Sequence, residues 1–182
     1  FNYENRFGIK ELGTRTIGLL IPAGKASVGA AYSHFGYSDF KREIAGLACG
    51  MKLSDKISAG VQVDYFSERT SGEYSNRQSV TFETGLIVSP SENIRIGIHI
   101  FNPVPNSIRK TYQPTTLTVG AGTDLSKTLF AGIEAEMSPG SKLIIKTGFE
   151  YEAAKSLWLR AGFSTCNNSF CFGTGYQSKF VM

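Results

Sequence analysis

LSDKISAGV at residues 53–61, PSENIRIGI at 90–98 and LSKTLFAGI at 125–133 are three copies of one phrase: a short polar turn, then an alternating segment centred on glycine. The central glycines are roughly 35–37 residues apart, enough chain for one two-stranded hairpin, and a fixed period indicates a repeated architectural unit. Weaker copies surround Gly29 and Gly162. The repeat therefore predicts consecutive antiparallel strands joined in hairpins.

The alternation separates oily from polar side chains, because successive residues of a strand point to opposite faces. The oily face is predicted to include Ile57, Val61, Ile96, Ile98, Ile133, Ile145 and Leu159. The opposite face collects a charge network made of Glu83, Arg95, His99, Glu134, Glu136, Lys146, Glu150 and Arg160. Buried charges of both signs are costly unless they are paired or hydrated. We therefore expect this face to border water or a salt-bridged lumen.

About twelve segments carry the pattern, with boundaries uncertain by about 2–4 residues. They are 2–9, 14–21, 26–36, 42–51, 57–67, 78–88, 94–101, 115–123, 128–137, 143–151, 157–165 and 170–181. Tight turns lie at one end, whereas the long connections 68–77 and 102–114 lie at the other, an asymmetry typical of outer-membrane barrels. The sequence predicts an all-β, antiparallel up-and-down transmembrane β-barrel, with residues 1–182 forming one domain.

Composition limits the other classes. No apolar run approaches the ~20 residues that a spanning helix needs, whereas a spanning β-strand needs only about 9–11. The net charge of +4 is mild. The basic residues are scattered, with Lys41-Arg42 and Arg109-Lys110 expected in loops, so we expect no nucleic-acid partner.

Few residues suggest chemistry. His34 and His99 lie in different repeats, and the chain contains no HExxH, CxxC or GxSxG motif. A cluster of His99 with Glu83 and Glu134 is less favoured than a salt-bridge network. The stretch GAGTD at 120–124 lacks the lysine of a phosphate-binding loop. We expect no catalytic residue, no metal and no cofactor, and hence no enzyme.

The cysteines make one structural prediction. Pairing Phe163 with Thr174 in the last hairpin places Cys166 opposite Cys171, and cross-strand neighbours are close enough to be candidates for a disulfide. Cys49, in IAGLACGM, is expected to be a buried small side chain.

Turn-strand phrases such as LSDKISAGVQVDYF, and QPTTLTVGAGTDL after a proline-containing loop, resemble the FadL-like outer-membrane barrels of Gram-negative bacteria. Within that group they resemble the Bacteroidetes branch with the PorV, PorQ and PorP/SprF-type proteins of type IX secretion. The resemblance implies fourteen strands and an N-terminal segment that plugs the lumen. This chain supplies about twelve strands and no such segment, so we expect a piece of a longer protein that lacks terminal strands.

The resemblance implies the bacterial outer membrane as location and a passive transport or secretion-associated role. The implied partners are membrane lipid or lipopolysaccharide, and secretion-system proteins or a hydrophobic small molecule. Inward bulky residues, Phe101, Phe130 and Trp158, would narrow a passage, so a secretion-associated barrel is ranked above an open diffusion pore. The alternative is a soluble calycin-like barrel that binds a small apolar ligand inside. That alternative reverses the faces, with the oily stripe inside.

Overall fold

The computed structural model describes residues 1–5, 8–9, 12–71, 76–103 and 114–177. These residues form twelve strands and one short 3-10 turn, η2 (Cys166–Asn168). Among them, no helix is long and apolar enough to cross a membrane. The strands are β1 (Asn2–Asn5), β2 (Gly13–Ala23), β3 (Ala26–Gly36), β4 (Phe40–Ser54), β5 (Ile57–Thr70), β6 (Arg77–Ser91), β7 (Ile94–Phe101), β8 (Thr116–Asp124), β9 (Leu129–Met137), β10 (Ile144–Ala154), β11 (Leu157–Ser164) and β12 (Ser169–Tyr176).

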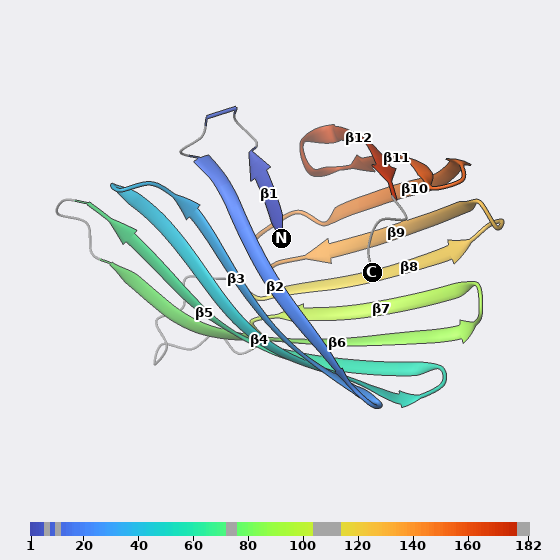
Figure 1. The fold of residues 1–182 in the computed structure, drawn as a ribbon, viewed down its shortest axis with the longest axis horizontal. Helices are drawn as coiled ribbons and strands as arrows, with labels where there is room; N and C mark the ends of the chain where they lie inside the picture. The colour runs from blue at the N-terminus through green and yellow to red at the C-terminus, as the bar shows by residue number, and fades with distance from the viewer. Residues whose placement is uncertain (6–7, 10–11, 72–75, 104–113, 178–182) are drawn as a thin grey trace. The chain divides into compact units, whose positions relative to one another are not determined.

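All twelve strands belong to one sheet, and their order in the sheet is their order in the chain. The registers from β1 to β5 and from β8 to β12 are antiparallel throughout. In Figure 1 the strands β2 to β5 follow one another as hairpins, and so do β8 to β11. The predicted all-β, up-and-down fold class is confirmed, and β1 and β12 stand at the two ends of the order.

Strand boundaries differ from the sequence prediction mainly where charged residues extend a strand. The β4–β5 ladder continues to the pairs Lys41 with Arg69 and Phe40 with Thr70, so the expected loop position of Lys41-Arg42 is wrong. Because successive side chains of a strand alternate between the faces, Lys41 points to one face and Arg42 to the other. Both side chains reach water, so the strand can extend through them. At the N-terminus β1 ends at Asn5 rather than at residue 9. Arg109-Lys110, most of 102–114 and the predicted strand end at 178–181 lie outside the described residues.

The chain divides into two compact units. Unit 1 comprises residues 1–85 and 100–115, and unit 2 comprises 86–99 and 116–182. The boundary falls inside β6 and β7, so each of these strands contributes to both units. The expectation of a single domain over 1–182 stays a prediction.

Burial in the described residues is inverted relative to a water-soluble protein. No hydrophobic side chain is buried, whereas the buried polar side chains are Asp64, Ser67, Ser79, Thr81 and Asn102. The large apolar side chains are instead exposed, for example Leu19 at 64% and Leu47 at 68%. A soluble domain buries such residues, because removing apolar surface from water drives folding. The soluble calycin-like alternative, which requires an oily interior, does not fit this arrangement.

The predicted pairing of the last hairpin is wrong. Phe163 lies opposite Phe170 rather than Thr174, and Cys171 lies opposite Gly162. The chain reverses within η2, where Asn167 and Asn168 have positive φ angles of 56° and 48°, a conformation that asparagine tolerates better than most residues. The turn is formed by residues 165–168, two residues earlier in the chain than predicted, so the register shifts and Cys166 lies outside the ladder.

The three cysteines are free thiols, so the candidate disulfide between Cys166 and Cys171 is absent from the structure. Cys49 was expected to be buried and is exposed. It lies between Val28 and Val61 in the register, on the oily face of β4. The prediction of burial is therefore wrong: the neighbours of Cys49 are apolar, but they lie on the exposed apolar side of the sheet.

Candidate functional site

The candidate site is the face of the sheet that carries the ionisable residues, here called the polar face. The face that carries Ile133 and Phe149 is called the apolar face. In unit 2 the registers place Glu134 opposite Lys146, and Glu150 opposite Arg160. Because side chains alternate, these four residues share one face and Ile133 lies on the other. Sequence alternation alone was sufficient to assign these residues to their faces.

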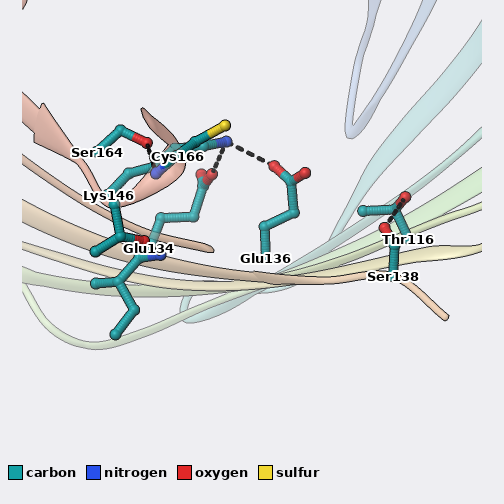
Figure 2. A network of polar contacts seen from close by, with 9 residues as sticks. Thr116, Glu134, Glu136, Ser138, Lys146, Ser164 and Cys166 are labelled. Carbon is teal, nitrogen blue, oxygen red and sulfur yellow. Dashed lines mark hydrogen bonds and ion pairs between the residues drawn. The ribbon is translucent and has the colours of Figure 1, made fainter. Parts of the chain in front are cut away.

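Lys146 is the centre of one charge cluster. Its Nζ donates a hydrogen bond of 2.9 Å to Glu134 Oε1 and one of 2.6 Å to Glu136 Oε2. Figure 2 shows the amino group of Lys146, on β10, beside the two carboxylates, which both come from the neighbouring strand β9. The three side chains are 29–42% exposed, so they remain partly hydrated. The cross-strand register, which sets Lys146 opposite Glu134, positions the cluster.

Two further ion pairs lie on the polar face in unit 2. Arg160 Nε donates to Glu150 Oε2 across β10 and β11. Arg95 Nη2 donates to Asp124 Oδ2 at 3.1 Å. Asp124 was missed in the sequence because it was assigned to a turn. It is the last residue of β8, where its backbone N–H also donates to Asn93 O.

A row of four glycines crosses unit 2 between these charges. Gly122 lies opposite Gly132, which lies opposite Gly148, which lies opposite Gly162. The row of Glu134 and Lys146 runs on one side, and the row of Glu150 and Arg160 runs on the other. The four glycines contribute no side chains to the strip of sheet between the two rows of ion pairs. Glycine in strand interiors commonly marks a bend or a close approach to backbone.

Phe130 lies along this strip instead of standing away from it. A Cβ built on Gly122 would come within 2.5 Å of Phe130 Cζ, and one on Gly132 within 3.5 Å of Phe130 Cε1. The ring therefore covers the two glycines, as aromatic side chains often do beside glycine in sheets. Phe101 packs edge-to-face on Phe66, with ring centroids 6.2 Å apart. Alternation had predicted the face of Phe130 and Phe101, but it does not specify the direction of a ring.

Unit 1 has its own polar face. Gln62 Nε2 donates to Asp64 Oδ1 at 2.8 Å, and both lie close to Gly46, where a Cβ would meet Asp64 Oδ1 at 2.5 Å. Glu83 interacts electrostatically with Asp64, which sequence reasoning missed because the prediction considered only the charges of later strands. Arg42 donates to Glu68 at 2.7 Å on the same face.

The predicted charge network is thus only partly brought together. Lys146 joins Glu134 and Glu136, and Arg160 joins Glu150, whereas Arg95 pairs with the unpredicted Asp124. Glu83 interacts electrostatically with Asp64, and the place of His99 in the network stays a prediction. Among the described residues, no three His, Cys, Asp or Glu side chains are grouped so as to hold a metal ion.

The ion pairs of unit 2 contain more acid than base. Four carboxylates, Glu134, Glu136, Glu150 and Asp124, face three cations, Lys146, Arg160 and Arg95. Pairs this exposed are worth only about 0.2–1 kcal/mol each. Their main effect is on the electrostatic potential along the polar face. A row of partly hydrated charges determines the potential that a nearby ion experiences.

An antiparallel meander with an exposed apolar face and a charged, glycine-lined opposite face has the fold of the outer-membrane porins, which are β-barrels. Two solved structures that it resembles are substituted forms of the Rh. blastica porin. Their TM-scores are 0.58 and 0.57, and each is 10% identical over 89% of this chain and 53% of the porin chain. This chain therefore spans about half the length of the porins that it matches. No family model matches the sequence, and no curated protein matches it.

Proposed function

We propose that this chain is part of a bacterial outer-membrane β-barrel that lets small hydrophilic solutes cross passively, without catalysis. The observation that carries the proposal is the inversion of polarity. Among the described residues, the buried side chains are polar, whereas large apolar side chains are exposed. Lipid, not water, stabilises such an exposed surface, and the opposite face of a membrane barrel can border an aqueous lumen.

The lining of the polar face supports an open path. The Phe130 ring lies over Gly122 and Gly132, against the wall of the sheet. From the sequence, a secretion-associated barrel ranks above a diffusion pore partly because Phe130 is expected to narrow the passage. With the ring over Gly122 and Gly132, and with Gly148 and Gly162 uncovered beside it, passive diffusion becomes the first proposal.

The charge balance of unit 2 suggests which solutes pass more easily. Four carboxylates against three cations leave one uncompensated negative charge among the ion-paired residues. A wall of that sign raises the local concentration of cations. We therefore propose a weak preference for small cations over anions, decreasing as ionic strength rises.

A FadL-like barrel that belongs to a type IX secretion system, or that takes a hydrophobic small molecule, is the second proposal. The repeated phrase of residues 53–61, 90–98 and 125–133 favours it. It predicts a protein partner or an apolar ligand and does not require steady ion flow.

Planar bilayers separate the two proposals. The purified chain should give steady single-channel currents with a reversal potential that shows mild cation preference. A chain that inserts into the bilayer, carries no current and co-purifies with a secreted partner would contradict the diffusion proposal and favour the second one.

A further inference from the structure

The apolar face of unit 1 changes character near the ends of β3, β4 and β5. One cross-strand row contains Ile17, Tyr32, Ala45 and Tyr65. The next row toward the strand ends contains Arg15, His34, Glu43 and Ser67, and the row after that contains Lys41 opposite Arg69. Because alternate residues of a strand share a face, these three rows lie on the same side of the sheet. We call Arg15, His34, Lys41 and Arg69 the basic rim.

The rim has positive charge that its own carboxylate does not balance. Glu43 is the acid of these rows; it accepts a hydrogen bond of 2.6 Å from the Tyr32 hydroxyl and is attracted by Lys41, Arg69 and His34. Arg15, Lys41 and Arg69 form no ion pair within 4.0 Å with any residue that the structure describes. On the polar face, by contrast, Arg42 is paired with Glu68. Three permanent cations against one anion leave the rim attractive to an anionic group.

Ser67 supplies an independent observation at the same place. It lies opposite Glu43 in the rim row and is 5% exposed. Its Oγ has no hydrogen-bond partner among the described residues. A buried hydroxyl without a hydrogen-bond partner is costly. An oxygen-rich ligand that reaches this row would supply an acceptor for the Ser67 hydroxyl.

We propose that the basic rim binds the phosphate groups of the outer-leaflet glycolipid, lipopolysaccharide, while its acyl chains lie on the apolar face. The proposal rests on the proposed location in the outer membrane. Phosphate accepts several charge-assisted hydrogen bonds, which arginine donates in a matching planar geometry. The rim continues directly into exposed Ile17, Leu19 and Leu47, so headgroup and chains can bind together. The rim lies at the end of the sheet where residues 71–76 connect β5 to β6, whereas the turns at the other end of β2 to β5, residues 24–25 and 55–56, are shorter. In barrels of this class the end with the longer connections is extracellular.

The test compares lipid binding by two triple variants of the full chain in detergent micelles. The rim variant is Arg15→Gln/Lys41→Gln/Arg69→Gln. The control, Lys25→Gln/Lys127→Gln/Lys155→Gln, removes the same charge from the tight turns. Native mass spectrometry would measure binding of bisphosphorylated lipid A and of its dephosphorylated form. We expect wild type and control to prefer the phosphorylated lipid, and the rim variant to bind it at least about tenfold more weakly, because three exposed ion pairs are lost.

Binding of the dephosphorylated form should not change. Equal affinity of wild type and rim variant for phosphorylated lipid A would overturn the proposal. So would full competition by inorganic phosphate at the same phosphate concentration, because the rim would then be a site for free phosphate. The charge-retaining variant Arg15→Lys/Arg69→Lys should keep most of the binding, which separates charge from misfolding. Single-channel currents of the rim variant should match wild type, so lost lipid binding with intact currents leaves the proposed function standing.

Discussion

Replacing Ile133 by arginine tests the assignment of the two faces at a single strand. Ile133 stands in the middle of β9 on the apolar face and is 54% exposed. Its cross-strand neighbours are Ala121 and Thr147, so no carboxylate could pair with the new charge. At ~3.4 Å per residue, either end of β9 is about 14 Å away along the strand. The guanidinium of the new arginine is therefore far from the membrane–water interface.

Ile133→Arg should therefore lower the free energy of unfolding in lipid by about 2–4 kcal/mol, the cost of arginine near the bilayer midplane. At 1.36 kcal/mol per tenfold, this is about 30- to 900-fold in the folding equilibrium constant. The matched control is Gly148→Arg on the polar face of neighbouring β10. A Cβ there meets only the Ala161 carbonyl oxygen at 3.7 Å. Glu134 and Glu150 flank this position in the register, so we expect a change within about 0.5 kcal/mol.

The measurement is reversible denaturant unfolding of both variants in lipid vesicles, with tryptophan fluorescence as the signal. A loss of stability in Gly148→Arg as large as that in Ile133→Arg would refute the face assignment. A larger loss in Gly148→Arg would mean that the faces are reversed.

Three further outcomes follow from the polar face and the cysteines. Lys146→Gln leaves Glu134 and Glu136 without their cation, so the reversal potential in bilayers should shift toward stronger cation preference. The control Lys142→Gln, which lies outside the strands, should leave the reversal potential unchanged. Gly122→Ala should lower single-channel conductance, because its Cβ would come within 2.5 Å of Phe130 Cζ and push the ring away from the sheet. The control Gly148→Ala has room for its Cβ and should keep the wild-type conductance. Equal conductance of the two variants would contradict the placement of the ring. In lipid vesicles a water-soluble maleimide should label Cys166, in the η2 turn, and spare Cys49, between Val28 and Val61; labelling of both would place Cys49 in water.

The strands and their faces could be predicted because alternation is a local property of the chain. Ile133, Gly132 and Glu134 needed no tertiary information to be assigned to their faces. The same alternation placed Lys146 with Glu134 and Glu136, although it did not show that one amino group binds both carboxylates. That arrangement depends on the register between β9 and β10.

The failures occurred where a turn or a side-chain torsion decides the outcome. The hairpin at Cys166 was predicted with the wrong register because the two asparagines with positive φ place the turn at residues 165–168 rather than 167–170. Phe130 was assigned to the correct face, yet its ring direction depends on the glycines beside it. The basic rim was missed because Lys41 was assigned to a loop, whereas the ladder with β5 extends through it.

Spin labels placed one at a time along β9, from residue 129 to residue 137, would test the central claim most directly. In lipid vesicles, collision with oxygen reports exposure to lipid, and collision with a water-soluble nickel complex reports exposure to water. The inverted polarity of the sheet predicts a period of two: oxygen collisions peak at Leu129, Ala131, Ile133, Ala135 and Met137, and nickel collisions peak at the residues between them. Nickel collisions that peak at Ile133, or an absence of alternation, would contradict a sheet with one face in lipid and the other in water.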